Sequence, residues 1–188
     1  MVKNVLAYLN QTRGVEIISA TVPPLSPATT VEDLLAPVKQ ALAADSIHRI
    51  KAMVISHISS EPAVVMPVEQ VARLCAARGI PLFVDGAHAT GQIEVDIGRL
   101  AAAGVKGYVG DGHKWLYSGK GSAVLWIAPE YQARVVPAVI SSEGVSKSPG
   151  ECSILPFSAG MDQYSCVLRS LSPCVCFVCA WCQNARAS

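Results

Sequence analysis

Short apolar runs alternate with helical segments along the first two-thirds of this chain of 188 residues. The runs are rich in Val, Ile, Leu and Phe, as buried strands are, and the segments between them repeat apolar residues at helical spacing. Strands that are joined by helices run parallel in one sheet, and helices then cover both of its faces. The sequence therefore predicts the α/β class, a mostly parallel sheet in an α/β/α sandwich. Strands are expected at residues 15–21, 53–55, 82–85, 105–109 and 122–127.

Capping and breaking residues mark the ends of the predicted helices. One helix is expected to begin at Thr30 or Val31, because acidic residues follow in its first turn, where they favour the helix dipole. Another opens at Pro67, and Gly79 and Gly104 close two helices, since glycine readily adopts the left-handed conformation of a helix C-terminus. These signals divide the chain into strand–helix–strand units.

An acidic residue and a lysine stand at the ends of two of these strands. Asp85 ends the apolar run 80–84, and Lys114 follows the strand at 105–110, after Gly112. Ligands of parallel sheets bind at the carboxyl ends of the strands, so this placement predicts a shared site. The pair suits pyridoxal phosphate: the lysine forms a Schiff base with its aldehyde, and the acid keeps the pyridine nitrogen protonated. Taken alone, Lys114 is better explained as a solvated loop lysine, and its pairing with Asp85 favours the site.

Three motifs lie around these two residues. Ser-His-Ile-Ser-Ser occupies positions 56–60, His-Lys-Trp-Leu positions 113–116, and a glycine-rich return positions 118–122. With them, the stretch 53–128 resembles the class V aminotransferase family of pyridoxal-phosphate enzymes. Within that family it is most similar to the branch of isopenicillin N epimerase-like proteins, cysteine desulfurases and C–S lyases. The resemblance implies the large domain of fold type I, represented here in part.

The resemblance implies roles for four residues. Lys114 would be the Schiff-base lysine and Asp85 the partner of the pyridinium nitrogen. His88, three residues after Asp85, would hydrogen-bond the phenolic oxygen of the cofactor, and His113 would lie near the phosphate or the aldimine. For His88 taken alone, a histidine of the core or of a helix cap is the competing interpretation.

The hydroxyls of Ser59 and Ser60 are further candidates for the cofactor site. They belong to the Ser-His-x-x-Ser signature that follows the strand at 53–55, from which they would reach the cofactor ring. Simple capping of the turn between strand and helix explains the same residues equally well. Both interpretations stay open at this point.

Two positions depart from the family pattern. Asp111, three residues before Lys114, stands where relatives carry Asn or Ser, which can donate to the phosphate. A carboxylate there repels a dianion, so either Asp111 points away or phosphate binding is weaker. In the segment 157–162, Met161 stands where a hydroxyl is expected.

The resemblance implies an enzyme that acts on a small-molecule amino acid with pyridoxal 5'-phosphate, and a homodimer in the full-length form. C–S bond cleavage of a cysteine-type substrate, as in lyases and desulfurases, is the first interpretation, and epimerase or aminotransferase-type chemistry is the second. Both begin when Lys114 removes the α-proton and Asp85 stabilises the resulting charge. The rival from another class is a catalytically inactive remnant that acts only by association.

The chain divides into a longer part that carries the family pattern and a short tail. Residues 1–164 are interpreted as part of the large domain, and 165–188 as a divergent tail that is not a domain of its own. A thiolate metal site in the tail is one interpretation, but the tail has no histidine and few polar residues to orient the thiolates, so no metal is expected. The tail holds five of the seven cysteines: Cys166, Cys174, Cys176, Cys179 and Cys182.

Segments that the family normally carries upstream and downstream are not recognisable. The upstream segment supplies the ring-stacking group and the phosphate-binding turn, and the downstream small domain binds the substrate carboxylate. The chain alone is therefore expected to be a poor catalyst, because positioning groups contribute much of an enzyme's rate.

Composition argues against several other classes of function. The net charge is +1 with acidic and basic residues interspersed, which leaves no basic stripe for nucleic acid or for an acidic membrane surface. No apolar stretch reaches the roughly 18 residues that span a bilayer. The first residues lack the apolar core of a secretory signal. The expected location is the cytoplasm, where cysteines such as Cys75 stay reduced.

Overall fold

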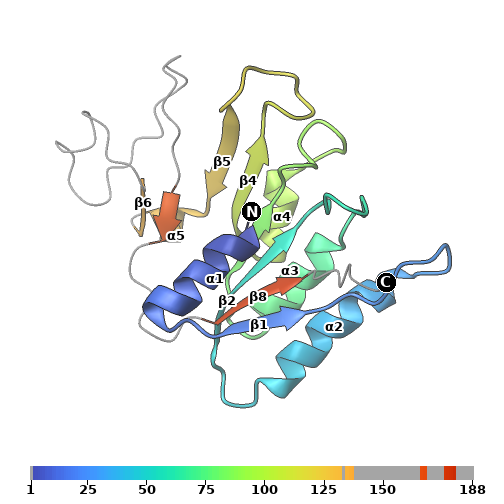
Figure 1. The fold of residues 1–188 in the computed structure, drawn as a ribbon, viewed down its shortest axis with the longest axis vertical. Coiled ribbons are helices and arrows are strands. Elements are labelled where there is room, and N and C mark those ends of the chain that lie inside the picture. Colours follow the sequence, from blue (N-terminus) through green and yellow to red (C-terminus); the bar gives the residue numbers. More distant parts are fainter. Residues whose placement is uncertain (1, 133, 138–165, 169–175, 181–188) are drawn as a thin grey trace.

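A computed structural model gives the structure of the protein and describes residues 2–132, 134–137, 166–168 and 176–180. Its main feature is a six-stranded sheet with the strand order β1-β8-β2-β3-β4-β5 (Figure 1). Neighbouring strands run parallel, except that β5 runs antiparallel to β4. In chain order the elements are α1 (Val2–Arg13), β1 (Ile17–Ala20), α2 (Val31–Ala44), β2 (Ile50–Ser56), α3 (Val68–Ala76), β3 (Leu82–Asp85), α4 (Ile97–Ala103), β4 (Val105–Asp111), β5 (Ala123–Ile127), α5 (Pro129–Gln132), β6 (Val135–Pro137), β7 (Cys166–Leu168) and β8 (Cys176–Ala180).

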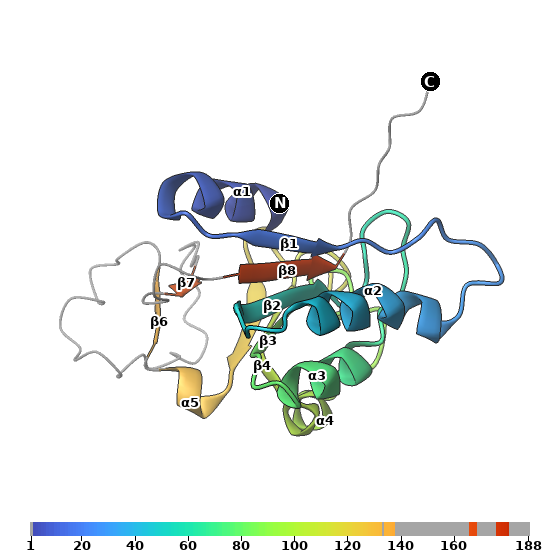
Figure 2. The same ribbon diagram turned by 90° about the horizontal axis from the view of Figure 1, so that it is seen from below.

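Helices cover both faces of this sheet. α1 lies on one face, and α2, α3 and α4 lie together on the other (Figure 2). The mostly parallel α/β sheet that the sequence predicts is therefore confirmed. A second sheet of two strands pairs β6 with β7. Within the described ranges, no helix is long and apolar enough to cross a bilayer.

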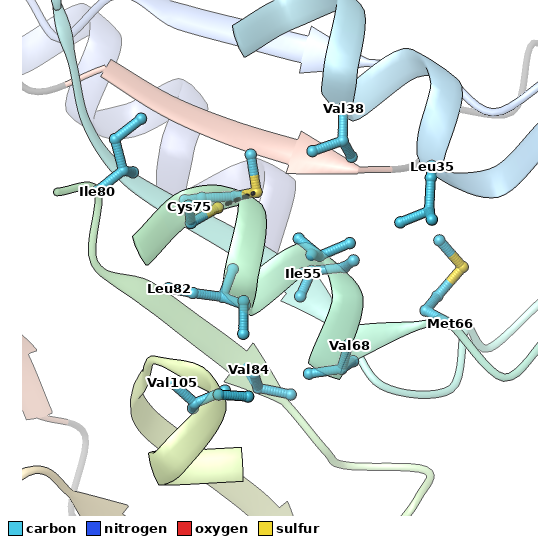
Figure 3. Close-up of a cluster of buried hydrophobic side chains, with 14 of the residues drawn as sticks. Leu35, Val38, Ile55, Met66, Val68, Cys75, Ile80, Leu82, Val84 and Val105 are labelled. Atoms are coloured by element: carbon cyan, nitrogen blue, oxygen red, sulfur yellow. Dashed lines mark hydrogen bonds between the residues drawn. The ribbon is translucent and has the colours of Figure 1, made fainter. Parts of the chain in front are cut away.

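The main core lies between the sheet and the layer of α2, α3 and α4 (Figure 3). β2 and β3 send alternate side chains into it, because successive residues of a strand point to opposite faces. Met53 of β2 and Leu82 of β3 are fully buried there, in one cluster with Val38 of α2 and Val71 of α3. The side chains thus interlock the sheet with three helices.

Cys75 belongs to the same core, and its Sγ atom lies 3.4 Å from Sδ of Met53. Burial raises the pKa of the Cys75 thiol to about 12. The thiol therefore stays protonated and unreactive at neutral pH, as a small apolar residue of the helix.

Several element boundaries agree with the sequence, although α3 ends at Ala76, before the Gly79 that was expected to close it. β3 and α4 have the predicted limits, and α2 begins after Thr30, whose side chain forms a capping box with Asp33. Gly104 ends α4 with a φ of 116°, in the left-handed region that only glycine adopts without strain. β2 starts at Ile50, earlier than predicted. The prediction missed this start because the exposed Lys51 interrupts the apolar run of the strand.

Strand β8 comes from the cysteine-rich tail, where the sequence pattern placed no strand. It lies between β1 and β2 and runs parallel to both, with Phe177 beside Ile17 and Ala52. The apolar residues around Phe177 carried the signal for this strand. The tail therefore contributes to the main sheet.

Truncation of a core side chain gives a direct test of this packing. We expect Leu82→Ala to lower the free energy of unfolding by about 2–5 kcal/mol, because it removes a fully buried side chain and leaves a cavity. Leu125→Ala, at a leucine that is 43% exposed, serves as the matched control and should cost clearly less. Denaturant unfolding measures both changes, and equal losses would contradict the described core.

Candidate active site

The candidate site lies at the carboxyl ends of β3 and β4. Asp85 is the last residue of β3 and pairs with Val109 of β4, and Asp111 is the last residue of β4. The backbone N–H of Gly86 donates to the carbonyl of Val109 at 2.6 Å, which ties the turn after β3 to the neighbouring strand. The parallel pairing thus brings the predicted acid next to the segment that leads to the lysine.

A tight turn after β3 presents His88. The Oδ1 atom of Asp85 accepts the backbone N–H of Ala87 at 3.0 Å, and the N–H groups of Ala89 and Thr90 both donate to the carbonyl of Gly86. This local hydrogen bonding shapes the turn that carries His88. The other carboxylate oxygen of Asp85, Oδ2, accepts no hydrogen bond from the described residues.

Lys114 reaches this turn from the segment after β4. Its Nζ atom lies 3.3 Å from Nε2 of His88 and 2.9 Å from Oδ2 of Asp111. The indole N–H of Trp115 lies 3.5 Å from the second ring nitrogen of His88. The structure therefore brings together Lys114 and His88, two of the residues that the sequence assigns to one site.

Asp111 faces into the site. Its carboxylate is an ion-pair partner of Lys114 and lies 3.7 Å from Nε2 of His113. The charge of Asp111 is therefore directed at the lysine, and its effect on a phosphate stays a prediction. His113 itself is exposed, and its Nδ1 atom lies 3.4 Å from the carbonyl of Ser122.

Gly112 allows the chain to fold back after β4. Its N–H donates to the carbonyl of Ser122 at 2.9 Å, and its own carbonyl accepts from Ser118 at 3.2 Å. A Cβ atom at this position would meet the hydroxyls of Ser118 and Ser122. Glycine is needed here for the packing of the return loop, which then holds Lys114 at the sheet edge.

The charges of the site act on His88. Burial lowers the pKa of His88, Lys114 lowers it further, and Asp85 and Asp111 oppose these effects. His88 is therefore neutral at pH 7, with one ring nitrogen that donates and one that accepts. A neutral imidazole beside Lys114 and Asp85 is able to hydrogen-bond a ligand oxygen.

Ser59 and Ser60 lie in the loop between β2 and α3. Ser59 is buried, and its hydroxyl accepts the N–H of Val64 at 3.1 Å and donates to the carbonyl of Pro62. Ser60 is exposed. These contacts of Ser59 are those of a local turn, and a contact of either serine with the cofactor stays a prediction.

His57 and Tyr108 are buried next to Asp85, and the sequence analysis gave neither of them a role. The Nδ1 atom of His57 lies 3.1 Å from the hydroxyl of Tyr108. The backbone N–H of His57 donates to the carbonyl of Asp85 at 2.8 Å. The position of His57 directly after a buried strand was the one sign in the sequence that it could belong to the site. Nothing in the sequence indicates its pairing with Tyr108.

A hollow of about 400 Å³ lies elsewhere, between the start of α3 and the start of α4. His57, Glu69 and Arg99 are among its lining residues, whereas Asp85 and Lys114 are not. Glu69 is held there by ion pairs with Arg73 and Arg99. Asp85 and Lys114, the carboxylate and the amine that suit the cofactor, lie at the carboxyl end of the sheet, so the hollow is not the candidate site.

Two features of the sequence lie outside the described residues. The segment 157–162 with Met161 is one, and the thiol groups of the tail cysteines are the other. Among the described side chains, no group of three His, Cys, Asp or Glu is placed to hold a metal ion.

Comparison with known proteins assigns the family. The family model described as Aminotransferase class-V matches residues 7–154, so the chain belongs to the class V aminotransferases. The L-cysteine desulfhydrase-like protein lolT1 of Epichloe uncinata is 35% identical over 136 residues, which are 71% of this chain and 29% of that protein. Isopenicillin N epimerase of Streptomyces clavuligerus is 33% identical over 93 residues, which are 50% of this chain and 23% of that protein.

Solved structures show a more distant likeness. The apo structure of cysteine desulfurase from Thermococcus onnurineus NA1 has a TM-score of 0.47 and 20% identity, over 68% of this chain and 35% of that chain. The chain thus spans less than a third of the length of the curated relatives and about a third of this solved structure.

The electrostatic coupling between Lys114 and His88 is open to direct measurement. We expect Lys114→Met to raise the pKa of His88, because the substitution removes a positive charge that disfavours the imidazolium form. An NMR titration of the His88 ring measures the change. Lys106→Met is the control, since Lys106 pairs with Glu130 away from the site. An unchanged or lower pKa of His88 in Lys114→Met would contradict the described geometry.

Proposed function

We propose that the protein is a pyridoxal-phosphate-dependent enzyme that acts on an amino acid through Lys114, with C–S lyase or desulfurase-type chemistry. One observation carries the proposal: in a chain of the class V aminotransferase family, Lys114 lies beside His88 at the strand edge where Asp85 ends β3. The chain spans less than a third of its curated relatives, so the activity of the whole protein is part of this proposal.

The residues of the site fit the ring and the aldehyde of this cofactor. Oδ2 of Asp85 has no hydrogen bond from the described residues, so it is free to accept a hydrogen bond from a protonated pyridine nitrogen. His88, neutral and half-buried, would hydrogen-bond the phenolic oxygen. When bound, pyridoxal phosphate supplies an aldehyde that reacts with amines and a ring that accepts electrons from the substrate's α-carbon.

Lys114 is the group that we assign to covalent attachment and to proton transfer. An amine acts as a nucleophile or a base only through its free electron pair. The carboxylate of Asp111 holds the Nζ atom of Lys114 in an ion pair at 2.9 Å, so Lys114 must leave Asp111 before it acts. His88, 3.3 Å from Nζ, is placed to hold the amine at the sheet edge during this change.

Asp111 weakens the site for a dianionic cofactor. It is directed at Lys114 and His113, two nearby groups that are able to donate to a phosphate. Its negative charge competes for them and repels the phosphate. We therefore propose weak cofactor binding and little or no turnover by the chain alone, with activity in a longer form.

The substrate class follows from the family branch. Relatives named L-cysteine desulfhydrase favour a cysteine-type substrate and C–S cleavage. A relative named isopenicillin N epimerase favours the second candidate, epimerisation. In both reactions Lys114 removes the α-proton, and they differ in whether a sulfur group leaves. Release of sulfide from cysteine, measured with a longer form, distinguishes the two.

Association with a second copy is part of the proposal, as is a cytoplasmic location. Leu116 and Tyr117, just beyond Lys114, are 53% and 84% exposed, and Trp115 is 41% exposed. A group of exposed apolar side chains beside a site is typical of a surface that another chain covers. We propose a homodimer in the full-length form, with residues 1–164 as part of its large domain.

Covalent trapping tests the role of Lys114. After incubation with pyridoxal phosphate and reduction with borohydride, we expect pyridoxyl mass on the peptide that contains Lys114. The matched variants are Lys114→Arg, which should lose the label, and Lys106→Arg, which should keep it. Peptide mass spectrometry makes the measurement. Label on Lys106 or Lys120 instead would refute the assignment, and no label on the wild-type chain would support an inactive remnant.

The role of Asp85 is tested in a longer form that is competent for turnover. We expect Asp85→Asn to lower kcat by about a hundredfold or more, because the ring nitrogen loses the charge that holds its proton. Asp96→Asn is the control: Asp96 caps α4 by accepting the N–H of Arg99, and asparagine caps equally well. Near-normal kcat in Asp85→Asn would count decisively against the proposal.

A further inference from the structure

Tyr108 and His57 lie directly behind the turn that carries Asp85. We propose that these two residues are positioning residues, which hold the carboxylate of Asp85 in the orientation that the cofactor ring requires. This inference rests on the proposed function of the site. It concerns two buried side chains that contact each other and the Asp85 turn.

The first contact is between the ring of Tyr108 and Gly86. Tyr108 lies in β4 and is 4% exposed. Any Cβ atom at position 86 would overlap the end of its ring and its hydroxyl. The turn therefore rests against the phenol, and glycine is required at position 86 because there is no room for a side chain.

The second contact joins Tyr108 to His57. The hydroxyl of Tyr108 lies 3.1 Å from Nδ1 of His57, and the two rings meet edge to face, with centroids 5.8 Å apart and planes at 85°. The backbone N–H of His57 donates to the carbonyl of Asp85 at 2.8 Å. His57 thus links the hydroxyl of Tyr108 to the backbone of Asp85.

The pair lies on the opposite face of the sheet from the carboxylate. Tyr108 pairs with Val84, and both belong to the core on the side of α2, α3 and α4. Asp85 follows Val84, so its side chain points to the other face. The support is therefore separate from the surface that binds the cofactor, and neither Tyr108 nor His57 is a catalytic residue.

Both side chains are neutral at pH 7. Burial raises the pKa of the Tyr108 phenol, a hydrogen bond with Thr90 opposes this, and the charge of Asp85 raises it further. Burial lowers the pKa of His57, against a smaller effect of Glu69. A neutral pair is able to hold the turn by hydrogen bonds without adding a charge that competes with Asp85.

Removal of one hydroxyl tests the inference in the whole chain. Tyr108→Phe keeps the ring against Gly86 but leaves His57 without its partner, so the turn is expected to loosen. Two readouts are used: hydrogen exchange of the Gly86 and Ala87 amides without cofactor, and the absorbance of bound pyridoxal phosphate during a titration. We expect faster exchange at these amides and about tenfold weaker cofactor binding, the loss of roughly one good hydrogen bond.

Tyr131→Phe is the matched control. Tyr131 is a half-buried tyrosine that packs edge to face on Phe83 of β3, with ring centroids 6.0 Å apart. The control loses the same atom and should change neither readout. His57→Gln removes the contact from the other side, and it decides the question if Tyr108→Phe does not fold.

The outcomes separate the inference from the proposed function. Exchange at Gly86 and Ala87 that stays at the wild-type rate in the folded variants overturns the positioning role. Faster exchange with unchanged cofactor affinity overturns it as well, because the support then has no effect on binding. If the wild-type chain binds no pyridoxal phosphate, the proposed function fails, and the positioning of Asp85 for that cofactor falls with it.

Discussion

The pairing of β3 with β4 is the interaction on which the site depends. The two strands run parallel, with Val84 beside Tyr108 and Asp85 beside Val109, so both end at one edge of the sheet. The turn after β3 and the segment after β4 then meet, and Lys114 reaches His88 at 3.3 Å. Loss of this register would separate every group that the proposed chemistry uses, although each would keep its place in the sequence.

The lysine at this end of the sheet already has a carboxylate partner without a ligand, which limits what the chain can bind. Lys114 is paired with Asp111, while Asp85 keeps one carboxylate oxygen without a described partner. A phosphate that enters must displace the Asp111 carboxylate from Lys114 and His113. Binding then gains little free energy, because one set of charged contacts replaces another. The same arrangement that keeps the amine in place thus opposes the cofactor.

The sequence predicted the features that depend on local pattern. The limits of β3 and α4 followed from an apolar run and from Gly104. The positions of Asp85 at the end of β3 and of Lys114 in the segment after β4 followed from the alternation of strands and helices. Three features were not predictable in this way. The insertion of β8 between β1 and β2, the direction of the Asp111 carboxylate and the pairing of His57 with Tyr108 all depend on contacts between distant segments. No spacing rule along the chain encodes such contacts.

The central claim is that the segments after β3 and β4 form one binding site for pyridoxal phosphate. NMR titration of the isotope-labelled chain with this cofactor tests it most directly, because each backbone amide reports on its own surroundings. We expect the largest shifts together at the amides of residues 86–90 and 112–116, with little change in α2. Shifts confined to the hollow between α3 and α4, or shifts at one of the two segments alone, would contradict the account.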